Sequence, residues 1–94
     1  MFITILGKRW RLRFTNLKKD NGDCDAPDVK NKEIRVRSNL KGELRLETII
    51  HECLHAADWH KDESYIEQKA IDLARILWRL GYRQLPDKEP HDGP

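Results

Sequence analysis

The spacing of apolar residues changes near residue 42, and this change constrains the fold more than any other feature of the sequence. Before it, apolar residues alternate with charged ones, as in "RWRLRF" at residues 9–14 and "EIRVR" at residues 33–37. After it, apolar residues recur every three or four positions. A period of two is typical of a strand with one buried face, and a period near 3.6 is typical of an amphipathic helix. The chain is therefore predicted to be an α+β domain, with the strands first and the helices after them.

Three strands are expected in the first part of the chain. Residues 2–6, "FITIL", are apolar and partly β-branched, and a turn at Gly7 and Lys8 would join them to residues 9–14 as a β-hairpin. Residues 33–37 read as a further strand. Residues 16–31 include "KKDNGDCDAPD", whose Asn, Gly, Asp and Pro residues predict a loop. We therefore expect a small antiparallel sheet of about three strands.

Two helices are expected in the second part. The first runs from about Gly42 to a break around residues 59–62, and the second from about residue 63 to residue 80, with Gly81 well placed to end it. At about 100° per residue, His51 and His55 lie on the side of the first helix opposite its broad apolar face. The apolar face of the first helix is formed by Leu46, Ile49, Ile50, Cys53, Leu54 and Ala57, and the apolar stripe of the second by Ile66, Ala70, Leu73, Ala74, Leu77 and Leu80.

Length and composition exclude several classes of protein. The 94 residues suffice for one small domain, expected over residues 1–84, and the polar residues 85–94 with their three prolines predict a flexible C-terminal tail. The net charge of +2 does not by itself imply a polyanionic partner. There is no apolar run of about 18 residues and no signal-peptide pattern, which predicts a cytoplasmic chain outside the membrane. Cys24 and Cys53 are too few for a disulfide framework and are expected to be free thiols.

One helix carries a motif with a chemical meaning, because His51, Glu52 and His55 form the pattern H-E-x-x-H. Two histidines four residues apart project from successive turns of one helix face, so both rings can reach one zinc ion. Glu52 lies about 100° round the helix from His51. It is poorly placed to be a ligand, but it could take the proton of a zinc-activated water as that water attacks a carbonyl. This pattern predicts one zinc ion per chain and a general base beside it.

The segment "TIIHECLHAADW", followed by an acidic residue and a helix, resembles the zincin metallopeptidases. It is most similar to the small gluzincin-like and SprT-like intracellular domains, over about residues 33–80. The resemblance implies a zincin-like fold in which an antiparallel sheet packs on the motif helix. It also implies zinc bound by the two histidines and a later acidic or histidine ligand, and hydrolysis of peptide bonds. The chain departs from the metzincin pattern, because Asp58 replaces the glycine of that pattern and His60 falls one residue short of its third histidine.

The third zinc ligand is expected among four residues that follow the motif. Glu63 is preferred, since it lies near the centre of the apolar stripe of the second helix, where a carboxylate needs a reason to be. The resemblance to gluzincins, whose third ligand is a glutamate on the helix after the motif, fits Glu63 or Glu67. His60 lies in the expected turn and ranks third. Asp58 is expected to orient a histidine by accepting a hydrogen bond from its ring N–H.

The start of the second helix bears on this choice. A capping box with Ser64 as N-cap would give Glu67 a structural role, whereas Asp62 as N-cap would place Glu63 in the first helical turn. Both arrangements are compatible with the sequence.

Other residues carry weaker expectations. The strand at residues 33–37 could be the sheet edge along which an extended substrate is aligned, or it could equally be an ordinary strand of the sheet. Tyr65 is a candidate to stabilise an oxyanion, and Cys24 is expected to be a loop thiol of unassigned role.

The function predicted from these residues is that of a zinc metallopeptidase, a hydrolase acting on a protein or peptide. The predicted zinc ligands are His51, His55 and Glu63, and Glu52 is the predicted general base. The alternative is a non-catalytic adaptor or nucleic-acid-binding domain that is stabilised by its metal. Against nucleic acid, Trp10 and Phe14 alternate with the arginines of their strand and so point away from them.

Overall fold

The computed structural model describes residues 1–84, and the predicted tail at residues 85–94 lies outside them. The predicted α+β class is confirmed, with strands preceding helices along the chain. The elements are β1 (Phe2–Ile5), β2 (Lys8–Thr15), β3 (Gly22–Cys24), β4 (Glu33–Arg37), α1 (Gly42–Ala57) and α2 (Glu63–Arg79).

The sheet differs from the expected one in strand number and direction. Its four strands lie in the order β1-β2-β4-β3, and the sheet is mixed, because β2 and β4 run parallel while the other two pairs are antiparallel. The hairpin of β1 and β2 is confirmed, but its turn lies at Leu6 and Gly7, one residue earlier than predicted. The φ angles of these two residues are 50° and 77°, and tight hairpin turns require such positive values. The prediction of a small sheet of about three strands is therefore one strand short, and its antiparallel direction is wrong for the β2–β4 pair.

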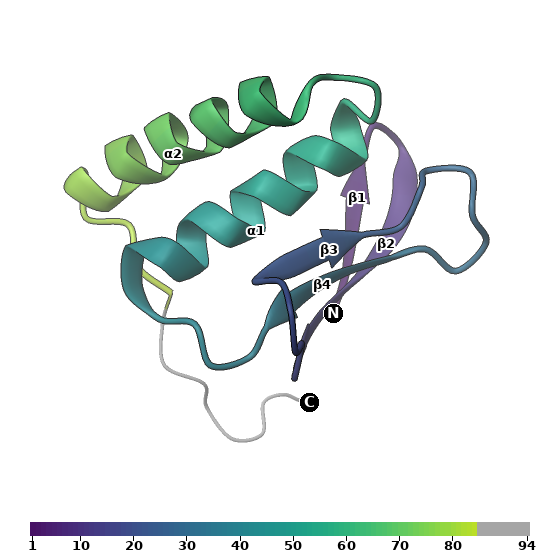
Figure 1. The fold of residues 1–94 in the computed structure, drawn as a ribbon, viewed down its shortest axis with the longest axis horizontal. Coiled ribbons are helices and arrows are strands. Elements are labelled where there is room, and N and C mark those ends of the chain that lie inside the picture. The colour runs from purple at the N-terminus through teal and green to yellow at the C-terminus, as the bar shows by residue number, and fades with distance from the viewer. Residues whose placement is uncertain (85–94) are drawn as a thin grey trace.

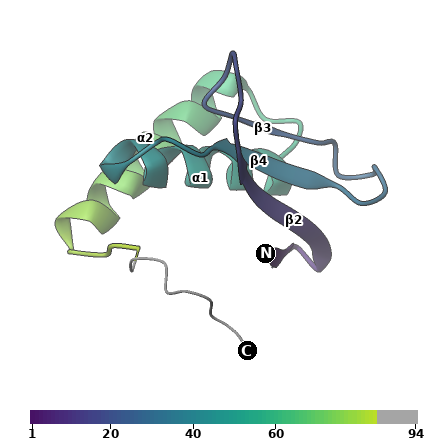
Figure 2. The same cartoon turned by 90° about the horizontal axis from the view of Figure 1, so that it is seen from below.

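The additional strand, β3, comes from the segment expected to be a loop. It pairs with β4, which consequently lies between β2 and β3 (Figure 2). Of the two roles expected for residues 33–37, the structure shows the ordinary interior strand and not the sheet edge, and β3 is an edge instead. The Arg35 guanidinium on β4 fixes this strand from one side, donating hydrogen bonds to Asp23 (2.6 Å) and Asp25 (2.7 Å).

The two faces of the sheet are separated as the alternation of residues predicts. Trp10, Leu12, Ile34 and Val36 are buried and form most of the core. The intervening arginines of β2 and β4 lie on the opposite face of the sheet, where Glu33 accepts hydrogen bonds from Arg13 and Arg35. The helices therefore cover one face only.

Helix α1 lies between α2 and the sheet (Figure 1), and α2 packs on α1 alone among the elements of residues 1–84. An inner helix must be covered on two sides, which explains the breadth of its apolar arc. Its most buried residues are Thr48, Glu52 and Ala56, one turn apart, rather than the predicted apolar set.

Within the described part of the chain, the outer helix α2 is covered on one side, by α1. Three residues of its predicted stripe, Ile66, Ala70 and Ala74, are fully buried. Leu73 and Leu80 are 38% and 68% exposed, so the stripe was predicted too wide. Gly81 ends the helix region with a φ of 94°, as expected.

Candidate metal centre

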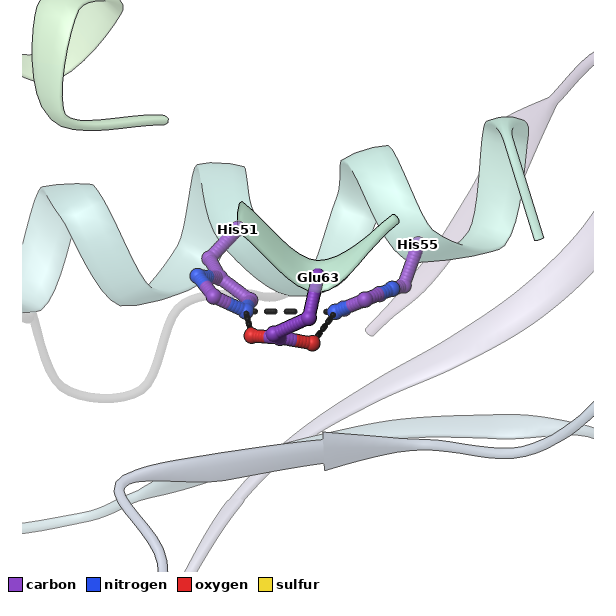
Figure 3. A group of neighbouring side chains, drawn as sticks. All are labelled: His51, His55 and Glu63. Carbon is purple, nitrogen blue, oxygen red and sulfur yellow. Dashed lines mark hydrogen bonds and ion pairs between the residues drawn. The ribbon is translucent and has the colours of Figure 1, made fainter. Parts of the chain in front are cut away.

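Three side chains converge where the two helices meet (Figure 3). His51 and His55 project from successive turns of α1, and Glu63 is the first residue of α2. The two Nε2 atoms lie 3.2 Å apart, and each is 2.9 Å from a different carboxylate oxygen of Glu63. These residues form the metal-compatible group found among residues 1–84.

The spacing of the three donors fits a zinc ion. Ligand atoms at about 2.0–2.1 Å from a tetrahedral zinc ion lie about 3.3–3.4 Å apart, close to the distances observed here. Without an ion, both nitrogens would have to be protonated to donate to Glu63, and two N–H groups would then meet at 3.2 Å. A cation satisfies all three donors at once, so the residues present fit the metal that the motif implies.

The start of α2 decides which acidic residue can join the histidines. Asp62 is the N-cap, so Glu63 stands in the first turn and the alternative capping box at Ser64 is not formed. Glu67 lies one turn further along α2, outside the group, and His60 is exposed in the turn between the helices. The preferred candidate, Glu63, is thus the one that the structure brings to the histidines.

Two other expectations about this region are wrong. Asp58 caps the end of α1 through its backbone, and in the described part of the chain no hydrogen bond joins its carboxylate to either histidine. Tyr65 follows Glu63 by two residues and therefore faces a different side of α2. Its hydroxyl accepts a hydrogen bond from Lys69 (3.0 Å) rather than facing the histidines.

Glu52 lies beside the three donors but is not one of them. It is 7% exposed, and burial raises the pKa of its carboxyl to about 7, with contributions from the negative charges of Asp23, Glu63 and Asp20. A carboxyl group with a pKa near neutrality can both accept and return a proton at physiological pH. The position therefore suits a general base.

A glycine allows Glu52 to be buried in this way. A Cβ atom at Gly22 would lie 2.9 Å from the Glu52 Cγ and 3.0 Å from the Thr48 Cγ2. The absence of a side chain lets the edge strand β3 pack directly on α1. The role of Gly22 has no distinct signal in the sequence, where this residue is one glycine within a segment predicted to be a loop.

A cleft of about 500 Å³ contains the metal-compatible group. Its walls are the α1 face bearing the histidines, the start of α2, and β3 with the residues before it. The residues that line it are Asp20, Asn21, Gly22, Cys24, Leu44, Glu47, Thr48, His51, Glu52, His55, Trp59, Glu63 and Glu67.

The free side of β3 faces outward from the sheet. Asn21 accepts a backbone hydrogen bond from Arg37 (2.7 Å), and Asp25 donates one to a carbonyl of β4 (3.0 Å). Bonding alternates along an antiparallel pair, so Gly22 and Cys24 direct their backbone N–H and C=O groups to the free edge. Both residues line the cleft.

Cys24 is not the open loop thiol that was expected. It lies on β3, half-buried against the core, and its thiol donates to the Asp25 carbonyl (3.3 Å). Burial raises its pKa to about 12, with a further contribution from the Glu52 charge. Such a thiol is a poor nucleophile and a poor metal ligand.

Comparisons with protein-family models, curated proteins and solved structures found no match to this chain. Neither helix of the described residues is long and apolar enough to cross a membrane.

Proposed function

We propose that this protein is a zinc-dependent hydrolase of peptide amide bonds. The observation that carries the proposal is the convergence of His51, His55 and Glu63 in one cleft with the buried carboxyl of Glu52. Three protein donors leave one position of a tetrahedral zinc ion for water or substrate, as catalytic zinc sites do. This arrangement supports catalysis over a purely structural metal, which four protein ligands would enclose.

The residues of the cleft have separate roles in the proposed reaction. A zinc ion held by His51, His55 and Glu63 would supply Lewis acidity, lowering the pKa of water to about 7 and polarising a carbonyl. Glu52 takes the proton from the attacking water and later returns it to the leaving amine. The bond from the carbonyl carbon to the amine breaks, and the products are a carboxylate and an amine.

The edge strand β3 gives the substrate a place beside the metal. The outward-facing N–H and C=O groups of Gly22 and Cys24 can pair with an extended peptide, as in strand addition to other sheet edges. An extended peptide on this edge runs along the cleft that holds the histidines. The expected alignment role thus passes from residues 33–37 to β3.

Metal content and activity together test the proposal. We expect about one zinc per chain in wild type and in Glu52→Gln, but peptide hydrolysis only in wild type. His51→Ala with His55→Ala should lose both zinc and activity. A wild-type protein that binds zinc without hydrolysing any member of a peptide library would contradict the proposal and favour the metal-stabilised adaptor.

The alternative function, nucleic-acid binding, predicts a characteristic dependence of affinity on salt concentration. Binding through the arginine face of the sheet would weaken steeply with salt, because phosphate contacts release counterions. The probe is a mixed-sequence single-stranded oligonucleotide. If the protein binds it with such a salt dependence and does not hydrolyse peptides, the nucleic-acid-binding function is favoured.

A further inference from the structure

The walls of the metal cleft have one sign of charge. Five carboxylate residues line the cleft, namely Asp20, Glu47, Glu52, Glu63 and Glu67, and no lysine or arginine of residues 1–84 does. The whole chain has 18 lysines and arginines against 16 acidic residues, so this separation is not a result of composition. A divalent ion would neutralise only two of the five charges.

Three of these carboxylates belong to neither the ligand set nor the proposed base. We call Asp20, Glu47 and Glu67 the acidic rim. Glu47 lies one turn before His51 on α1, and Glu67 lies one turn after Glu63 on α2. The helices run in opposite directions beside each other (Figure 1), so Glu47 and Glu67 lie on the same side of the donors, away from the connecting turn.

Asp20 lines the same cleft from the segment that precedes β3. It precedes Gly22, which contacts Thr48 and Glu52 on the adjoining turns of α1. None of the ion pairs formed within the described range of the chain uses a carboxylate of the acidic rim. The rim is therefore a set of carboxylates that form no ion pair within residues 1–84, and they come from α1, α2 and the segment before β3.

An independent observation at the floor of the cleft points to a cationic ligand. The Glu52 side chain lines the cleft, and only 7% of the residue is exposed, so 93% of it is buried. Within residues 1–84, no hydrogen bond or ion pair to its carboxylate is found. Its carboxylate oxygens are not among the sealed polar atoms of the described residues, so they open to the cleft, where the other fully charged side chains are also acidic and none is a lysine or arginine. A positive group entering the cleft would interact favourably with Glu52 and with the rim.

We propose that the cleft selects cationic peptides, in which a lysine or arginine flanking the scissile amide is held by the acidic rim. The selection of a cationic peptide stands on the charge of the cleft, and the cleavage of that peptide rests on the proposed function. A cleft lined by one sign of charge also raises the local concentration of oppositely charged ligands and speeds their association. A lysine ammonium can be shared among several carboxylates, and an arginine can bind one of them through two parallel hydrogen bonds.

Binding of matched peptides tests the inference without hydrolysis. Zinc-loaded Glu52→Gln protein is titrated with fluorescein-labelled peptides that are identical except for one central Lys, Gln or Glu. The Lys peptide should bind most tightly and the Glu peptide most weakly, and the difference should shrink as salt is raised.

Variants of the rim provide the matched comparison. In the same background, Glu47→Gln with Glu67→Gln should weaken binding of the Lys peptide by up to about fivefold for each carboxylate removed. Asp28→Asn with Asp72→Asn changes the net charge equally but alters residues outside the cleft, and should leave the Lys preference intact. Equal losses in both double variants, or equal affinities for the Lys and Glu peptides, would overturn the inference, as would no binding of any peptide.

Hydrolysis by the wild-type protein then separates this inference from the proposed function. Charge-selective binding without cleavage of any peptide overturns the peptidase but supports the cationic ligand. Cleavage at equal rates whatever the charge of the flanking residue supports the peptidase and overturns the selectivity.

Discussion

Gly22 on the edge strand packs directly against Glu52 on the motif helix, where a Cβ atom would lie 2.9 Å from the Glu52 Cγ. The Arg35 carbonyl and the Thr48 Cγ2 would each lie 3.0 Å from the same Cβ, so a side chain at residue 22 has no free direction. One backbone position thus determines how closely the strand and the proposed base approach each other.

Gly22→Ala should therefore reduce both stability and hydrolysis. The added methyl group must push β3 away from α1, and we expect a loss of about 1–3 kcal/mol in the free energy of unfolding, as for overpacked cores. Chemical denaturation and peptide hydrolysis measure the two effects. Gly7→Ala is the control, because residue 7 has open space around it but a φ of 77°, and its strain should cost about 1–2 kcal/mol without lowering activity. Full activity in Gly22→Ala would show that the strand position is not important for the reaction.

Glu63 and Glu67 should differ sharply in their effect on zinc affinity. Glu63→Gln removes the carboxylate that meets both histidines, and we expect zinc to bind at least about 100-fold more weakly. Glu67→Gln, one turn away, should change the affinity by less than about threefold, since it alters only a nearby charge. Competition with a chromogenic chelator measures both. The opposite ranking would move the third ligand to Glu67.

Cys24 should react slowly with alkylating reagents in the folded protein. Because its pKa is raised to about 12, mainly by burial, the reactive thiolate is scarce at pH 8. We expect alkylation of Cys24 to be at least about 100-fold slower than in the unfolded chain. Mass spectrometry of the alkylated protein measures the rate and distinguishes Cys24 from Cys53. Glu52→Gln should accelerate the reaction of Cys24, since the Glu52 charge also raises its pKa. Rapid labelling of Cys24 in the native wild-type protein would contradict its burial.

The carboxylates around Arg35 should make stability fall at acidic pH. Hydrogen bonds from Arg35 lower the pKa values of Asp25 and Glu33 from their ordinary 3.8 and 4.5. Their contribution is fully present above those ordinary values and is lost as the pH falls through the lowered ones. Arg35→Met should cost about 1–2 kcal/mol at pH 7, and its difference from wild type should shrink between pH 5 and pH 2, as followed by urea unfolding. A difference that does not change with pH would exclude this network as the cause.

Local patterns were sufficient for the motif helix and for the group at its end. The positions of His51 and His55 follow from helix geometry. Glu63 is favoured by its place on the next helix, so the sequence alone predicts this group of three residues. Alternation likewise identified which side of β2 and β4 is buried, because side chains of a strand alternate strictly.

The edge strand could not be predicted in this way. Its three residues, Gly22–Cys24, have weak strand propensity, and their placement depends on β4 and on ion pairs to Arg35, which is distant in sequence. The parallel pairing of β2 with β4 depends on the same long connection. The burial of Glu52 was missed for a related reason, since it results from the close approach of Gly22.

Among the elements of residues 1–84, the outermost helix α2 packs on α1 alone, and this has a consequence for how the protein responds to metal supply. An ion shared by His51, His55 and Glu63 would clasp the first turn of α2 to the interior of the molecule. When the ion is removed, amide protons near the start of α2 should exchange with solvent sooner than those of the sheet, because local opening begins where fewest contacts must break. Zinc scarcity would then loosen one wall of the cleft while the strands stay folded.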